Sequence, residues 1–291
     1  MDFSDYPALY KSADSGSNKA QARFLWTVRS EYFLLVLLAL ASSSAVKYTG
    51  AWVISLLLAS LLTMLLIYRF FSDNDIQWYR CRALAESVKT ASWRFACRAH
   101  PYESVDEVKA AVRNFLSDLN AIRRDNEFIG KALDERFADL NQITDEMFRV
   151  RELPVEERLH FYLEERVKDQ RKWYANKAKY NKTRKRAWFG IMIISYLCVF
   201  GSIVAGHFSI FDTEPLTNAL AVGITSSIGW IQVKRHGELS VSYLLAAHEI
   251  GSLIQRKDEV DSEEALSDYV NTAELAFSRE HTQWAARASA V

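Results

Sequence analysis

Apolar residues gather in four long runs along the chain, and charged residues fill the segments between them. Residues 187–211 contain no Asp, Glu, Lys or Arg, and a second uncharged run covers residues 216–233. Two further apolar runs cover residues 32–46 and 51–71. A helix needs roughly 20 apolar residues to cross the hydrocarbon core of a bilayer. The pattern therefore predicts two transmembrane helical hairpins, and favours them over buried hairpins of a soluble core.

The segments between the hairpins have the periodicity of amphipathic helices. Apolar residues recur at three- and four-residue steps through 75–99, which predicts a helix with one buried face. The same steps through 105–122 have the spacing of a coiled-coil seam, and 129–140 continue it past Gly130. Packing of this seam within the chain is favoured over packing on a neighbouring copy, and both remain open.

The second half of the chain predicts a very long helix. Pro154 suits the first turn of a helix, and neither Gly nor Pro occurs from Val155 to Trp188. The helix is therefore expected to run without a break into the third span. Residues 237–256 and 264–288 predict two more helices after the fourth span.

The two halves of the chain resemble each other. The segment NKAQARF before the first span is similar to NKAKYNK before the third, and each half holds one hairpin with helices before and after it. This predicts a duplicated two-span unit, with a first copy at 18–153 and a second at 154–291. Residues 1–17 contain Ser, Asp, Gly and Pro and are expected to be flexible.

Charge sets the expected orientation of the spans. Lys and Arg cluster before the first and third spans and after the second and fourth, whereas the links inside the hairpins carry only Lys47. By the positive-inside rule both termini and the middle segment are expected in the cytoplasm of a multi-pass protein. The totals of Lys plus Arg and of Asp plus Glu are both 36, so charge gives no reason to expect nucleic acid as a partner.

The sequence contains no motif of an enzyme or of a cofactor site. Motifs of metalloproteases, phosphate-binding loops, dinucleotide-binding folds and serine hydrolases are all missing. His160 and Glu164 have helical ligand spacing, yet one such pair is more typical of an exposed ion pair. We therefore expect no enzyme activity, no cofactor and no metal.

Polar residues within the spans are candidates for the lining of a pore. Because lipid is a poor solvent for amides, polar positions that share one helix face indicate a path for water or ions. A second interpretation is that they bond their own backbone or lie at span ends. The candidates are Asn218, Thr225, Gly229 and Gln232 in the fourth span and Ser55, Ala59 and Thr63 in the second.

Two motifs carry a resemblance to a known family. The segments WYRCRALAESVKTASWRFACRAHPY at 78–102 and AFSREHTQWAAR at 276–287, with the tandem hairpins, resemble the SLATT group of bacterial two-transmembrane effector domains. The resemblance covers the chain from about Tyr6 to its end. The residues that map onto the family pattern, with structural roles as the simplest expectation, are Arg82, Glu86, Lys89, Trp93, Glu280 and Trp284.

The resemblance implies a function that periodicity alone does not give. It implies an all-α integral membrane protein with long cytoplasmic helices that forms a pore in, or perturbs, the inner membrane in an anti-phage or conflict system. Such an effector is expected to act as a homo-oligomer in contact with membrane lipid, with a nucleotide-sensing or signalling partner as trigger. The alternative is a non-conducting membrane scaffold or signal receptor.

Overall fold

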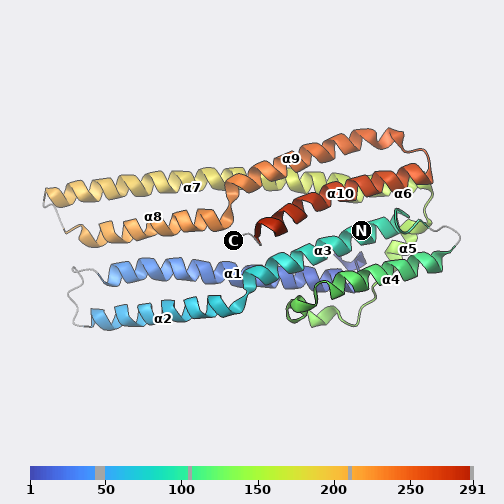
Figure 1. Cartoon of the computed structure of the whole chain (residues 1–291). Helices are drawn as coiled ribbons and strands as arrows, with labels where there is room; N and C mark the ends of the chain where they lie inside the picture. The colour runs from blue at the N-terminus through green and yellow to red at the C-terminus, as the bar shows by residue number, and fades with distance from the viewer. Residues whose placement is uncertain (43–49, 104–106, 209–211, 289–291) are drawn as a thin grey trace. The chain divides into compact units, whose positions relative to one another are not determined.

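The computed structural model describes residues 1–42, 50–103, 107–208 and 212–288; the side chains of 127, 128, 131 and 279–288 lie outside the description. Every regular element in the described part is helical, as the sequence predicts (Figure 1). The first half contains α1 (Ala8–Ala41), α2 (Ala51–Ser72), α3 (Asn74–Ala96), α4 (Val108–Arg124) and α5 (Asp145–Glu152). The second half contains α6 (Val155–Tyr162), α7 (Asp169–His207), α8 (Glu214–Lys234), α9 (His236–Gln255) and α10 (Glu263–Ala288).

The chain divides into two compact units, and each takes residues from both halves of the sequence. The membrane unit comprises residues 22–74 and 179–240, and the polar unit comprises residues 1–21, 75–178 and 241–291. The predicted sequence units 18–153 and 154–291 therefore do not coincide with the two compact units of the structure. Long helices such as α1 and α7 contribute residues to both units because their apolar and charged parts follow each other without a break.

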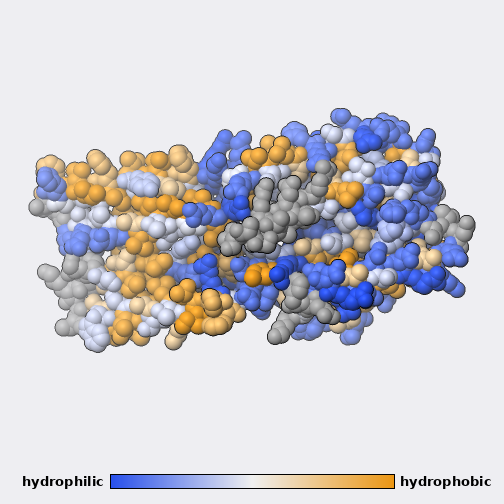
Figure 2. Space-filling model, in the orientation of Figure 1, coloured by the Kyte–Doolittle hydropathy of each residue, from blue (hydrophilic) through white to orange (hydrophobic). Residues whose placement is uncertain are grey.

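The membrane unit contains the apolar helices. The helices that begin at Ala8, Ala51 and Val155 each hold a stretch long and apolar enough to cross a membrane. Helix α8 is not among these three, although it has 21 residues, because it carries more polar side chains. Figure 2 shows apolar residues gathered on the surface of the membrane unit, whereas the surface of the polar unit is mostly hydrophilic.

Side-chain contacts join the helices of each hairpin in antiparallel order. The carboxylate of Glu31 in α1 accepts a hydrogen bond from Arg69 near the end of α2 at 2.8 Å. In the second hairpin, the hydroxyls of Ser202 in α7 and Thr217 in α8 are 2.8 Å apart. The link predicted at residues 47–50 and the end of the first span at 43–46 lie almost wholly outside the described residues.

The polar unit has an aromatic core built by the predicted helices. Trp93 and Phe95 in α3 and Phe115 in α4 are fully buried, and the Phe95 and Phe115 ring centroids are 4.8 Å apart. The seam of α4 therefore packs inside its own chain. Val105, which the pattern placed at the start of the seam, lies outside the described residues.

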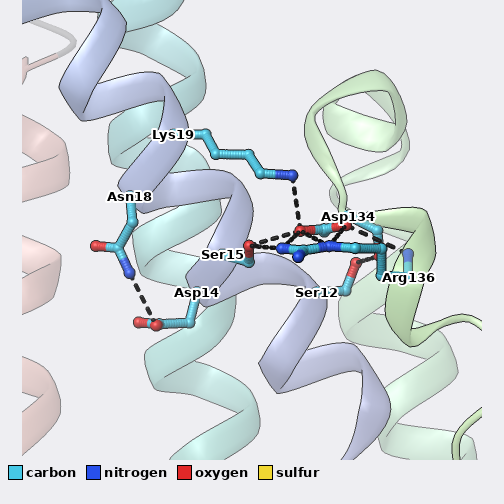
Figure 3. A network of polar contacts seen from close by, with 7 residues as sticks. All are labelled: Ser12, Asp14, Ser15, Asn18, Lys19, Asp134 and Arg136. Atoms are coloured by element: carbon cyan, nitrogen blue, oxygen red, sulfur yellow. Dashed lines mark hydrogen bonds and ion pairs between the residues drawn. The ribbon is translucent and has the colours of Figure 1, made fainter.

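The predicted continuation of the seam past Gly130 is wrong. Helix α4 ends at Arg124, and 3-10 turns follow at Glu127–Ala132 and Glu135–Phe137. Figure 3 shows the reason: the buried carboxylate of Asp134 accepts hydrogen bonds from Ser15 at 2.6 Å and Lys19 at 2.8 Å and from its neighbour Arg136. These bonds, one of them from the Arg136 backbone amide, hold a turn that competes with a helix.

The expectation that residues 1–17 are flexible is also wrong. Helix α1 begins at Ala8, and Tyr6, Tyr10 and Ala13 are buried in the core of the polar unit. The Ser and Asp residues that suggested a loop act as hydrogen-bonding groups; the Ser12 hydroxyl, for example, donates to the carbonyl of Asp134 at 2.9 Å. Aromatic burial and these bonds together offset the entropy of ordering the segment.

The long second-half helix is confirmed. Helical backbone runs from Val155 to His207, a length of 53 residues. One π-helical turn, Leu163–Lys168, interrupts its regular spacing between α6 and α7. Such turns insert one extra residue per turn and frequently occur at functional positions.

Candidate functional site

Four motif residues of α3 lie on one face of the helix inside the polar unit. Arg82, Glu86, Lys89 and Trp93 are separated by four, three and four positions, so they share that face. The Arg82 guanidinium donates to Glu86 at 2.7 Å and to Asp14 of α1 at 3.1 Å. These contacts tie the motif to the first turns of α1.

The next positions along the same face are held by the N-terminal segment. The indole nitrogen of Trp93 donates to the hydroxyl of Tyr6 at 2.8 Å, and both residues are buried. The ammonium of Lys89 lies over the Tyr6 ring, 5.6 Å from its centroid. Tyr6 therefore positions two of the four motif residues.

A buried ion pair from the second half of the chain completes the cluster. Arg166, in the π-helical turn, donates two hydrogen bonds to Glu274 of α10, at 2.9 and 2.8 Å. The hydroxyls of Tyr162 and Thr90 donate to the same carboxylate at 3.0 and 2.9 Å. Both charged side chains are at most 2% exposed. Thr90 of α3 thus connects the two halves of the chain through one carboxylate.

The electrostatics of the cluster follow from this burial. Burial by itself lowers the pKa of Arg166, but the charge and hydrogen bonds of Glu274 outweigh it, and the pKa is raised. Burial raises the pKa of Tyr162 well above its usual range, so this phenol stays protonated and donates. A charge buried at this depth is tolerated only because hydrogen-bonding partners surround it.

The pKa of Lys89 is shifted toward neutral pH. Burial lowers its pKa to about 8, and the nearby positive charge of Arg166 contributes to the shift. A titrating group beside a buried ion pair is a functional-site candidate, because its charge state changes the balance of the cluster. The arrangement can hold helices of both halves together and weaken when one charge changes. Among the described residues of the cluster, no nucleophilic side chain is paired with a general base.

We predict that Lys89 makes the stability of the polar unit depend on pH. Lysine titrates at about 10.4 in an unfolded chain. Between its folded and unfolded pKa values the unfolded chain binds the proton that the folded chain has released, so stability rises with pH. From about pH 8 to pH 9, the free energy of unfolding of the wild type, measured by chemical denaturation, should rise by about 0.5–1 kcal/mol more than that of Lys89→Met. Equal pH dependence of stability in both proteins would show that Lys89 does not contribute to it.

The pore-lining candidates of α8 differ in their exposure to solvent. Asn218, Thr225 and Gln232 are exposed in the single chain. Gly229 instead packs against the Tyr32 phenol of α1, where any added side chain would collide. The hydroxyl of Thr225 donates to the backbone carbonyl of Ala221 at 3.0 Å. The exposed face therefore consists of three of the four predicted positions.

The pore-lining candidates of α2 also differ in exposure. Thr63 is exposed and its hydroxyl donates to the carbonyl of Ala59 at 2.9 Å, whereas Ala59 is half-buried. Ser55 is half-buried and accepts from Ser42 at 3.4 Å. The last two motif residues, Glu280 and Trp284, belong to α10, but their side chains lie outside the described part.

Sequence reasoning missed the ion pair at the centre of the cluster. A signal for it was present: Glu274 follows Val270 by four positions and precedes Phe277 by three, so a carboxylate lies within the apolar stripe of α10. A charged residue on a buried face requires a partner. That partner, Arg166, lies 108 positions away in the sequence, so helical spacing cannot identify it.

Comparison with protein families gives two adjacent matches. Residues 7–159 match a model described as SMODS and SLOG-associating 2TM effector domain 3. Residues 162–284 match a model described as SMODS and SLOG-associating 2TM effector domain 1. No curated protein and no solved structure matches the chain. The two matched ranges meet at the helix that carries Tyr162 and Arg166, and Thr90 and Glu274 come from different ranges.

Proposed function

Because the chain belongs to the SLATT family and contains two tandem SLATT domains, we propose that it is an oligomeric effector that forms a pore in, or perturbs, the bacterial inner membrane. The observation that carries this proposal is the pairing of two effector-domain matches with helices apolar enough to cross a membrane. In this proposal the protein is not an enzyme, and a partner or nucleotide signal in a conflict system triggers it.

The exposed polar face of α8 supports an assembly of several copies. In a single chain, the side chains of Asn218 and Gln232 face outward. Lipid satisfies such amides poorly, so a second copy or a column of water is a better environment. Because one chain has too few spans to enclose a wide aqueous path, conduction requires a homo-oligomer.

The polar unit supplies a way to control the spans. The same continuous helix carries Arg166 in the polar unit and then forms the third span. A signal that changes the buried cluster would therefore act on a helix that enters the membrane. A bistable element of this kind is what a triggered effector needs.

The experiment for pore formation compares dye release from vesicles that contain the purified chain. We expect Thr225→Leu to reduce release several-fold, because it replaces the mid-span hydroxyl of the proposed pore face with a larger apolar group. Ile228→Leu in the same helix is the matched control and should release dye like the wild type. Membrane insertion and oligomer mass are measured for all three proteins.

The outcomes separate the two classes of function. Release that Thr225→Leu leaves unchanged removes this face from the pore and directs attention to Ser55, Ala59 and Thr63. Partner binding without any release supports the non-conducting scaffold or receptor.

We propose that both termini and residues 72–186 lie in the cytoplasm. The distribution of Lys and Arg supports this orientation. A cysteine introduced at Asp212, in a chain with Cys198 replaced by Ser, should react with a membrane-impermeant thiol reagent added from outside the cell. A cysteine at Asp75 should react only after the membrane is opened. The reverse pattern of labelling would invert the topology.

A further inference from the structure

A cavity with an unusual charge opens at the surface of the membrane unit. It has a volume of about 640 Å³ and is lined by α1, α7, α8 and the first residue of α9. Three permanent cations line it: Arg29, Arg184 and Lys234. No Asp or Glu is among its lining residues. Its size is in the range of cavities that bind small ligands.

Two of the cations lie over the same aromatic ring. The guanidinium of Arg29 lies over the Trp230 ring, 5.1 Å from the centroid, and the ammonium of Lys234 is 5.6 Å from the same centroid. The guanidinium of Arg184 lies over the Tyr180 ring at 5.2 Å. No described carboxylate forms an ion pair with Arg29 or Arg184. An anion bound in the cavity would interact favourably with the two arginines, which no described carboxylate pairs.

The imidazole of His236 responds to the same positive field. Burial lowers the pKa of His236, and the charges of Lys234 and Arg184 lower it further. Its ring nitrogen Nδ1 is 2.7 Å from the side-chain oxygen of Asn181. The ring is therefore positioned and mainly neutral, so the permanent charge of the cavity comes from the three cations.

The cavity changes from charged to uncharged along the spans. All three cations lie at the ends of apolar runs: Arg29 precedes the first, Arg184 precedes the third and Lys234 follows the fourth. Phe33 and Val36, farther along α1, line the same cavity, and Ser226 and Ser227 line it on α8. A molecule with a phosphate group and a hydrocarbon chain matches this sequence of environments, whereas a wholly hydrophilic anion matches only the charged end.

We infer that this cavity binds the phosphate headgroup of an anionic phospholipid, with its acyl chain along α1 and α8. Arg29 and Arg184 donate charge-assisted hydrogen bonds to the phosphate, and Lys234 adds a point charge. The lipid would join the two hairpins at the basic ends of the spans, because Arg29 belongs to the first hairpin and the other two cations to the second.

The test measures lipid binding to the full chain by native mass spectrometry in detergent. The protein is titrated with phosphatidylglycerol, with phosphatidylcholine and with inorganic pyrophosphate. The double variant Arg29→Gln with Arg184→Gln removes two cations of the cavity. The matched control, Arg23→Gln with Arg186→Gln, removes one exposed cation from each of the same two helices, and neither residue lines the cavity.

We expect phosphatidylglycerol to bind the wild type and the control with equal affinity and the cavity variant at least tenfold more weakly. Equal losses in both double variants would overturn the site, because the effect would then come from net charge. Phosphatidylcholine bound as tightly as phosphatidylglycerol would also overturn it. Pyrophosphate bound in a cavity-dependent way, without phosphatidylglycerol, would replace the lipid with a free phosphate ligand.

A second measurement keeps the inference testable if the cavity variant fails to fold. A photoactivatable phosphatidylglycerol is crosslinked to the wild-type chain, and the labelled peptides are mapped. Label on the peptides of α1 and α8 that contain Tyr32 and Trp230 supports the site. Label confined to other peptides contradicts it.

Discussion

Replacing Glu274 with Gln should lower the free energy of unfolding of the polar unit by about 3–5 kcal/mol, because the change leaves the buried charge of Arg166 without its counter-ion. The carboxylate accepts two hydrogen bonds from Arg166 and one each from Tyr162 and Thr90. Neither charged side chain can recover its interactions from water, since both are nearly inaccessible. A unit of this size loses roughly 2–4 °C of melting temperature per kcal/mol, so circular dichroism of the purified chain should show a decrease of about 10 °C.

Two controls define what that measurement means. Glu164→Gln breaks an exposed ion pair with Lys168 and should leave the melting temperature nearly unchanged, because solvent screens such a pair. The double variant Arg166→Met with Glu274→Leu removes both charges and should restore most of the lost stability. A melting temperature unchanged by Glu274→Gln would contradict the buried pair, and a double variant as unstable as the single one would show that the charges stabilise the unit directly.

Replacing Phe115 with Asp should unfold the polar unit. The Phe115 ring is fully buried and packs on Phe95 and Tyr102, with ring centroids 4.8 and 5.7 Å away. Loss of a buried aromatic side chain alone costs about 3–5 kcal/mol. A buried carboxylate adds a desolvation penalty, and the sum is comparable with the total stability of about 5–15 kcal/mol typical of a domain. Hydrogen exchange should show lost protection in α3 and α4.

The matched control lies one position along the same helix. Leu116 is 36% exposed, and Leu116→Asp should change the melting temperature by no more than a few degrees. Reduced oligomer mass with normal stability in Phe115→Asp would show that the seam is an interface between copies. Unchanged stability and mass together would show that the seam carries neither packing nor assembly.

The sequence by itself determined the features that depend on local pattern. Runs of about 20 apolar residues identify membrane helices because only a helix satisfies its own backbone in lipid. The three- and four-residue steps identified α3 and α4, and the lack of Gly and Pro identified the helix that begins at Val155. The motif residues Arg82 and Trp93 came from the resemblance; the structure buries Trp93 beside Tyr6 and pairs the half-buried Arg82 with Glu86.

Only the tertiary structure decided which residues meet across long separations. The turn at Asp134 is held by hydrogen bonds from Ser15 and Lys19 of α1. The apolar spacing of residues 129–140 cannot reveal these partners, because they lie far away in the sequence. The cavity cations come from both hairpins of the membrane unit, and Arg29 and Arg184 lie 155 positions apart in the sequence. Periodicity reports one helix at a time, whereas hydrogen bonds and ion pairs depend on neighbours that the fold supplies.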